Sequence, residues 1–170
     1  MKKFLALAVA VLLAFGASAQ VQKGEMILGV NIGLGNTVYP TMKALPPITL
    51  EYEHGLLEGL FDIDGFCLGV GGILAYTEDY SNEYKYSSVI VAAKGYLHYD
   101  FSDLEELDIY ATVSLGWNIT STKDPAPIYP FPLFYDVSIG ARYWFTDSFA
   151  ANLESGYGLS WLKAGINFRF

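Results

Sequence analysis

The sequence predicts an all-β fold: an eight-stranded antiparallel up-and-down transmembrane β-barrel preceded by a cleaved signal peptide. Three observations carry this prediction. The first residues have the composition of an export signal, alternating apolar and polar residues fill most of the remaining chain, and the chain ends on such an alternating segment. Alternation is typical of a strand with one apolar and one polar face, and segments of about ten residues match a tilted strand that crosses a bilayer.

The amino-terminal residues 1–19 are predicted to be a signal peptide. Two lysines precede the apolar run "FLALAVAVLLAFG", and the small residues "ASA" follow where a signal peptidase cleaves. A transmembrane anchor is the alternative, but the run is shorter than the roughly 20 residues of a spanning helix. The single cysteine, Cys67, is far from the cleavage point, which argues against a lipid anchor there and against an internal disulfide. We therefore expect an exported barrel domain over residues 20–170.

The charge of the chain argues against nucleic acid as a partner. The sequence has 10 basic and 18 acidic residues, and removal of the two lysines of the signal leaves 8 basic against 18 acidic residues, a net charge of −10. Nucleic-acid-binding domains are instead basic on at least one face.

Eight segments are predicted to be strands because each one alternates. By their apolar residues they cover 26–34, 48–52, 66–76, 89–99, 107–119, 135–145, 149–157 and 162–170. The opposite parity of these segments holds the polar and charged residues, including Asn31, Glu51, Glu53, Lys94, His98, Ser114, Asp136, Arg142, Asn152, Glu154, Lys163 and Asn167. Glycines lie between them on the same parity, where they leave room for large inward neighbours.

The direction of the two faces is predicted from the aromatic residues at the strand ends. A soluble barrel of the lipocalin kind would turn its apolar parity inward, around a ligand. A membrane barrel turns it outward and carries an aromatic girdle at each interface. One predicted girdle is Phe66, Tyr99, Phe145, Phe149, Phe168 and Phe170, and the other is Tyr76, Trp117, Tyr135 and Tyr157. The apolar parity is therefore expected to face lipid.

The connections between segments fall into two groups. Short acidic turns such as "FSDLEELD" and "FTDSF" alternate with longer connections such as "GNTVYPTMKALPP" and "STKDPAPIYPFP". Outer-membrane barrels have short periplasmic turns and longer extracellular loops, so both termini are expected on the periplasmic side. Nine acidic residues from Glu58 to Asp147, Asp108 among them, are assigned to positions at or beside the periplasmic turns.

The last segment, "WLKAGINFRF", alternates up to the terminal aromatic residue. Its apolar positions are Leu162, Ala164, Ile166, Phe168 and Phe170. The whole predicted barrel resembles the small eight-stranded outer-membrane barrels of the OmpA-like and OmpX-like type, and these five positions resemble the assembly signal of that family. The resemblance implies an outer-membrane location in the cell envelope, with membrane lipids and the barrel assembly machinery as partners. Unlike the two-domain members of that family, the sequence ends on its last predicted strand, so we expect no peptidoglycan-binding domain to follow.

Six charged residues of the inward parity are predicted to form a network that plugs the lumen: Glu51, Glu53, Lys94, Arg142, Glu154 and Lys163. A two-residue turn after Tyr157 sets Glu154 opposite Lys163. A three-residue turn between the preceding two strands sets Arg142 opposite Asn152 and within reach of Glu154. Because buried charges need partners, this network is expected to fix the register and to make the barrel a poor ion conductor.

Two other functions are alternatives to a structural or surface-recognition barrel. Some barrels of this size resemble lipid-modifying enzymes, but the two histidines, His54 and His98, are expected at the periplasmic rim, where they would hydrogen-bond with Glu53 or Asp100. A wide pore needs about sixteen strands, which leaves at most a small conductance. We expect no enzymatic activity, catalytic residue, cofactor or metal.

The loops are then the expected contact surface for an extracellular ligand or a host surface. The candidate contact residues are Tyr129 and Phe131 in the proline-stiffened segment "DPAPIYPFPLFY". The alternative is that the aromatic residues of this segment dip into the lipid head groups. Adhesion, membrane integrity and defence are equally compatible with the sequence.

Overall fold

The computed structural model describes residues 21–36, 43–59, 65–80, 85–100, 106–122 and 132–170. The predicted signal peptide and the candidate loop residues Tyr129 and Phe131 lie outside the described residues. No helix in the described part of the chain is long and apolar enough to cross a membrane.

The described chain is built of strands, eight of which form the barrel wall. These eight are β1 (Met26–Asn36), β3 (Ile48–Glu58), β4 (Phe66–Tyr80), β5 (Lys85–Asp100), β6 (Leu107–Thr122), β7 (Leu133–Thr146), β8 (Phe149–Tyr157) and β9 (Ser160–Arg169). A further strand of two residues, β2 (Lys43–Ala44), pairs with the end of β4 and lies outside the eight-stranded prediction.

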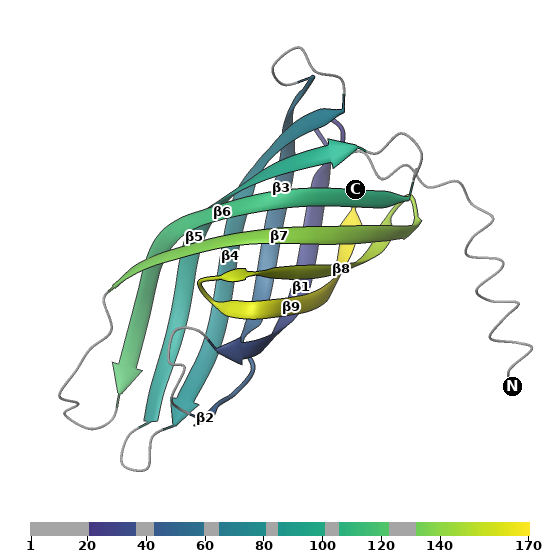
Figure 1. Cartoon of the computed structure of the whole chain (residues 1–170). Helices are drawn as coiled ribbons and strands as arrows, with labels where there is room; N and C mark the ends of the chain where they lie inside the picture. The colour runs from purple at the N-terminus through teal and green to yellow at the C-terminus, as the bar shows by residue number, and fades with distance from the viewer. Residues whose placement is uncertain (1–20, 37–42, 60–64, 81–84, 101–105, 123–131) are drawn as a thin grey trace, which may run out of the picture.

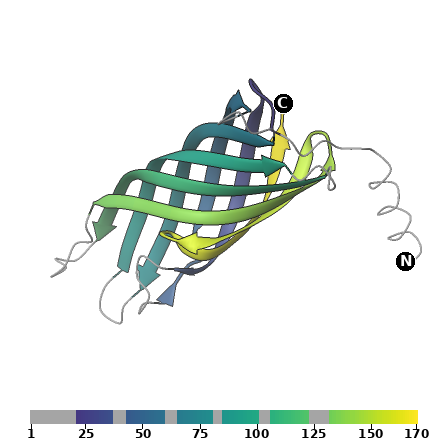
Figure 2. The ribbon, with the colours of Figure 1, turned by 45° about the horizontal axis from the view of Figure 1, so that its top comes forward.

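The wall is a closed, up-and-down, antiparallel barrel (Figures 1 and 2). Each wall strand pairs with the next one along the chain, and β9 returns to pair with β1. At this seam Leu28 lies opposite Phe168 and Ile32 lies opposite Ala164. Because β9 pairs on both sides, its backbone groups are satisfied. The predicted eight-stranded closed barrel is confirmed.

The two ends of the barrel differ in what they carry. We call the end where Val21 and the carboxyl-terminal Phe170 lie the terminus end, and the opposite end, which carries β2, the distal end (Figure 1). The strands β1, β4, β6 and β8 run from the terminus end to the distal end, and the other wall strands run back.

The two faces of the wall have the predicted composition. On β6, Val113 is 60% exposed on the outer face, whereas the next residue, Ser114, is 2% exposed in the lumen. The same alternation of exposed and buried residues runs along β7 and β8. The outer face is thus apolar, and the lumen face is polar and charged.

Trp161 departs from the predicted parity. Simple alternation puts it on the inward side with Lys163, but it is 64% exposed on the outer face. Its indole ring lies against Gly35, where a Cβ atom would be 2.5 Å from the indole Nε1 atom. Gly35 has a positive φ of 73°, which glycine adopts without strain. The distal start of β9 is therefore irregular, and regular alternation begins after Trp161.

Candidate functional site

The lumen of the barrel buries many charged side chains, and these contact one another. The charged side chains form two groups. We call Glu51, Lys94, Asp136, Glu154 and Lys163 the lysine cluster, and Glu53, His98, Asp108 and Arg142 the His98 tetrad. All nine residues are at most 5% exposed.

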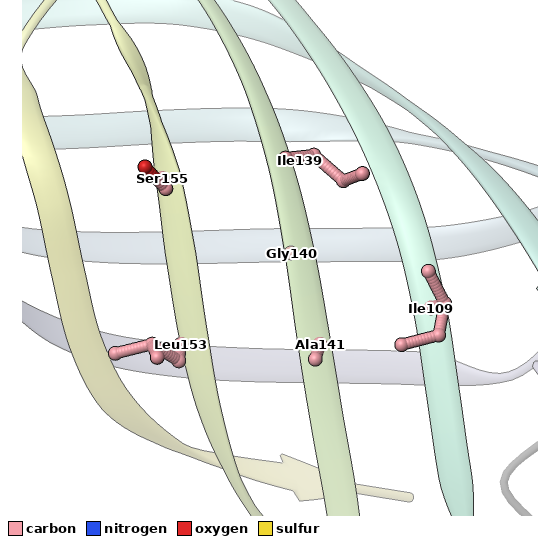
Figure 3. A pocket seen from close by; sticks show the side chains of 6 residues that line it. All are labelled: Ile109, Ile139, Gly140, Ala141, Leu153 and Ser155. Carbon is pink, nitrogen blue, oxygen red and sulfur yellow. The ribbon is translucent and has the colours of Figure 1, made fainter.

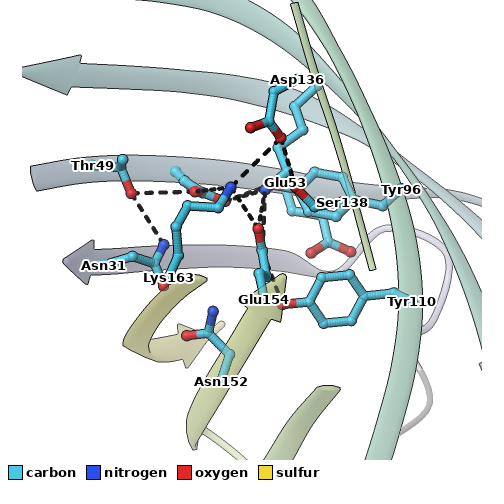
Figure 4. Close-up of polar contacts among 12 residues, drawn as sticks. Asn31, Thr49, Glu53, Tyr96, Tyr110, Asp136, Ser138, Asn152, Glu154 and Lys163 are labelled. Atoms are coloured by element: carbon cyan, nitrogen blue, oxygen red, sulfur yellow. Dashed lines mark hydrogen bonds and ion pairs between the residues drawn. The ribbon is translucent and has the colours of Figure 1, made fainter. Parts of the chain in front are cut away.

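The lysine cluster is centred on Glu154, which contacts both lysines (Figure 4). The Nζ atom of Lys163 lies 2.7 Å from Oε2 of Glu154, as the neighbouring positions on β8 and β9 predict. The Nζ atom of Lys94 lies 3.1 Å from Oε1 of Glu154 and 2.6 Å from Oε2 of Glu51. Lys163 has two more distant acidic neighbours, Asp136 at 3.7 Å and Glu51 at 3.9 Å. The cluster thus ties five strands together across the lumen.

Two tyrosines complete the surroundings of these carboxylates. The Tyr110 hydroxyl donates to Oε1 of Glu154 at 3.0 Å, and the Tyr96 hydroxyl donates to Oε2 of Glu51 at 3.4 Å. The Nζ atom of Lys94 lies 4.9 Å from the centroid of the Tyr96 ring. Such donors and ring faces replace part of the water that ionised side chains lose on burial.

The His98 tetrad lies nearer the terminus end and links β3, β5, β6 and β7. The Nε2 and Nδ1 atoms of His98 lie 2.7 Å from Oε1 of Glu53 and 2.8 Å from Oδ1 of Asp108. The guanidinium of Arg142 contacts the second oxygens of the same two carboxylates, at 2.8 Å from Glu53 and 3.3 Å from Asp108. Each acid therefore contacts both bases.

The structure corrects one expectation about these residues. Arg142 does lie opposite Asn152, but its guanidinium pairs with Glu53 and Asp108 and not with Glu154. The reason is that Lys94 and Lys163 already flank Glu154, while Glu53 faces Arg142 across the lumen.

The structure also adds detail for His98 and Asp108. Asp108 is the second residue of β6 and so lies beside a turn, as expected, and its side chain is 3% exposed in the lumen. His98 contacts the expected Glu53 and, in addition, Asp108. The inward direction of Asp108 could have been predicted from the alternation of β6, because Asp108 has the same parity as the inward residues Tyr110 and Ser114. His98 and Asp136 also have inward parity, but nothing in the sequence indicates which charges they meet.

Apolar residues close the lumen on both sides of the charged groups. At the terminus end, Val21 packs in a buried cluster with Ile27, Trp144 and Ala150. Toward the distal end, a second buried cluster consists of Ile73, Ala75, Ile90, Ala92, Phe134 and Leu159. The lumen is therefore filled in three layers, and both charged groups lie in the middle one. At the terminus end the Arg169 guanidinium also lies 3.8 Å from the centroid of the Trp144 ring and contacts Glu25 at 3.2 Å.

The segment before β1 folds back into the terminus end. The Gly24 N–H donates to the Gly55 carbonyl at 2.9 Å, and the Gly55 N–H donates to the Glu25 carbonyl at 2.9 Å. A Cβ atom at Gly55 would lie 2.1 Å from the Gln22 carbonyl oxygen, so this close approach requires glycine. These contacts hold Val21 inside the barrel, where it is 2% exposed. The sequence carried no signal for this, because the segment does not alternate.

The β8–β9 turn closes the distal side in a similar way. Leu159 in this turn is fully buried, and its N–H donates to Oδ2 of Asp136 at 3.2 Å. The Ser138 hydroxyl donates to the other Asp136 oxygen at 2.8 Å. Asp136 therefore serves both the lysine cluster and the turn that inserts Leu159.

The outer face carries aromatic contacts at both ends. At the terminus end the rings of Phe145, Phe149 and Phe168 follow one another, with centroids 5.9 and 5.4 Å apart. At the distal end the rings of Tyr135 and Tyr157 are 6.2 Å apart. The five positions of the proposed assembly signal lie on β9 or just after it, with Ile166, Phe168 and Phe170 exposed on this face.

A shallow hollow interrupts the outer face over β6, β7 and β8 (Figure 3). It is lined by Ile109, Ile139, Gly140, Ala141, Leu153 and Ser155. Ser155 has the only polar side chain of this lining, and its hydroxyl donates a hydrogen bond to the Trp161 carbonyl. The surface of the hollow is therefore mainly apolar. Among the described residues no group of three or more His, Cys, Asp or Glu side chains is arranged to hold a metal ion.

Known structures of transmembrane β-barrels are similar to the chain in fold. No protein-family model and no curated protein matches the chain. A solved structure described as "De novo design of transmembrane beta-barrels" is similar to it, with a TM-score of 0.55 and 16% identity over 88% of this chain and 98% of that one. The N-terminal β-barrel domain of Pseudomonas aeruginosa OprF is also similar, with a TM-score of 0.49 and 14% identity over 87% of this chain and 98% of that one. The chain thus shares the fold of a transmembrane β-barrel.

Proposed function

We propose that the protein is an integral outer-membrane β-barrel with a plugged lumen, whose role is structural or in surface recognition through its loops. The observation that carries this proposal is the distribution of residue types across the wall. Large apolar side chains are exposed along the outer face, and the nine charged residues of the lysine cluster and the His98 tetrad are buried in the lumen. Water on the outside would make this arrangement unfavourable, whereas hydrocarbon makes it favourable.

The plugged lumen argues for a structural barrel in preference to a pore. Eight strands enclose a space that side chains can fill. Here Val21 and Leu159 are inserted toward opposite ends of that space, and the lysine cluster and the His98 tetrad lie between them. An ion entering from either side would have to pass one of these apolar layers before it reached the lysine cluster or the His98 tetrad.

The same geometry supports a role without catalysis. A lipid-modifying enzyme needs its histidine beside the lipid head groups, next to a nucleophile or an activated water. His98 is 3% exposed and is held between two carboxylates inside the barrel. His54 lies near the terminus end of β3, the end proposed to face the periplasm. Neither position suits chemistry on outer-leaflet lipids.

The membrane part of the proposal is tested by substitution at Val113. In a bilayer, Val113→Arg places a charge near the middle of a lipid-facing strand and should cost roughly 2 to 4 kcal/mol, measured by denaturant unfolding from lipid vesicles. Val113→Leu is the matched control and should change little. On the surface of a water-soluble barrel, Val113→Arg would be nearly neutral, within about 0.5 kcal/mol, and that result would reject membrane insertion.

The recognition part is tested by photo-crosslinking in intact cells. A photoreactive amino acid at Tyr129 or Phe131 should form adducts with an extracellular ligand or host surface, whereas the same group at Tyr143, on the outer face near the terminus end, should react with lipid and with the assembly machinery during insertion. Adducts confined to lipid at all three positions would reject the loop as a contact surface and leave a structural role.

A further inference from the structure

The His98 tetrad is a closed ring of ionic contacts. Each carboxylate gives one oxygen to His98 and the other to Arg142, with all four distances between 2.7 and 3.3 Å. The members come from four strands, and β3 and β7 are not neighbours in the sheet. The ring therefore spans the lumen.

The positions of the two imidazole nitrogens determine where a proton must be. A neutral imidazole carries a proton on one nitrogen and a lone pair on the other. In this structure both nitrogens lie close to carboxylate oxygens. Nδ1 is hydrogen-bonded to Oδ1 of Asp108 at 2.8 Å, and Nε2 lies 2.7 Å from Oε1 of Glu53 in an ionic contact that is not aligned as a hydrogen bond. A nitrogen without a proton would be repelled by a carboxylate oxygen at either distance. Either the ring carries a second proton, or one of the two acids is protonated.

Arg142 decides between these two arrangements. Its guanidinium contacts the remaining oxygen of both Glu53 and Asp108. A guanidinium favours the ionised form of each carboxylate that it contacts. The extra proton is therefore held by the imidazole ring, and the tetrad has two negative and two positive charges.

The other groups around the ring are compatible with a cation. On its own strand, the Tyr96 ring stacks on His98 with centroids 6.0 Å apart and planes 11° apart. On β6, the Tyr110 ring lies 5.5 Å from the His98 ring and 4.9 Å from the Arg142 guanidinium. Cys67 occupies the facing position on β4. The acidic groups facing the ring are Glu53 from β3 and Asp108 from β6, and Arg142 from β7 lies beyond both.

We propose that His98 is a resident imidazolium, a buried cation of the lumen like Lys94, Arg142 and Lys163, and that it clamps Glu53 to Asp108 at the terminus end. This inference rests on the geometry of the tetrad and not on the proposed function. Its consequence is that the terminus end of the barrel is held by a charge that a neutral side chain cannot replace.

The direct test is nitrogen NMR of the histidine rings in the folded barrel. The chain has two histidines, so His54→Gln leaves the His98 signals alone in a ¹⁵N-histidine-labelled sample. At pH 8 both ring nitrogens of His98 should carry protons, whereas an ordinary histidine, with a pKa of about 6.5, would have lost one. A single protonated nitrogen at pH 8 would overturn the proposal. This measurement needs no change in the tetrad.

Two carboxylate-to-amide variants separate the clamp from the general charge of the lumen. Asp108→Asn removes one of the two acids that contact the ring, so His98 should lose its second proton at a lower pH than in the parent barrel. Glu154→Gln makes the same chemical change in the lysine cluster and should shift that titration much less. Equal shifts in the two variants would show that Asp108 does not clamp the ring and would also overturn the proposal.

Discussion

The two charged groups of the lumen bury a similar number of ionised side chains in different ways. The His98 tetrad sets two acids against two bases, and both oxygens of each acid have a basic partner. The lysine cluster sets three acids against two lysines, and the distances spread from 2.6 to 3.9 Å. The tetrad is closed and balanced, whereas the cluster has an acidic excess and several longer contacts.

The difference follows from the bases that each group uses. Guanidinium and imidazolium groups are planar and hold their donors in fixed directions, so each contact depends on the others. An ammonium group is compact and can turn toward whichever acid remains. We therefore expect the tetrad to fail when any member is removed, and the lysine cluster to redistribute its contacts.

The largest expected effect comes from neutralising the arginine. Arg142→Met keeps an apolar stem of similar length but leaves Glu53 and Asp108 with His98 alone, and removal of one partner from a buried ion pair costs about 3 to 5 kcal/mol. Lys163→Met should cost clearly less, because Glu154 keeps Lys94 at 3.1 Å and the Tyr110 hydroxyl at 3.0 Å. Urea unfolding of both variants from vesicles gives the comparison. Equal losses would contradict the distinction between a closed ring and a redistributing cluster.

The second effect is the coupling within the lysine cluster. Glu154→Gln and Lys163→Met, alone and together, form a double-mutant cycle for the contact at 2.7 Å. Residues in one charge network are typically coupled by about 0.5 to 3 kcal/mol. We expect a coupling energy within that range but below its upper limit. Glu154 also contacts Lys94, and Lys163 also lies near Asp136, so each residue keeps another partner when the other one is replaced. Additive single effects would show that the two residues do not interact.

The smallest effect concerns the apolar layer that covers the tetrad. Val21→Ala removes buried methyl groups from the terminus end and should cost about 1 to 2 kcal/mol, at roughly 0.8 kcal/mol for each buried carbon. Gln22→Ala is the control, since Gln22 is exposed. The same urea series measures both. A loss for Gln22→Ala as large as that for Val21→Ala would mean that the segment is held by its backbone and not by the inserted side chain.

The wall of the barrel could be predicted from sequence because its two faces meet opposite environments. Val113 and Ser114 are neighbours in the chain, yet Val113 is exposed on the outer face and Ser114 is buried in the lumen. The alternation of apolar and polar residues along the strand follows this alternation of environments. The contact between Glu154 and Lys163 could also be predicted, because a short hairpin turn makes them opposite positions on adjacent strands.

The partners of Arg142 could not be predicted by the same reasoning. Glu53 is 89 positions away and lies on a strand that does not neighbour β7. Contacts across a lumen depend on the rotamer of each side chain and on which neighbouring side chains already fill the space. The alternation of a strand specifies only which face each residue is on. The insertion of Val21 into the lumen could not be predicted for a related reason. It depends on the close approach of the preceding segment to Gly55, which has no side chain, and not on a periodic pattern.

The central claim, that the lumen is filled, is tested most directly by recording current through the protein in planar bilayers. Three layers of packed side chains should leave no continuous water path, so the folded protein should give no large steady conductance at moderate voltage. Arg142→Met should remain equally closed, because the apolar layers around Val21 and Leu159 are intact in that variant. A large, steady conductance from the unmodified barrel would contradict the account.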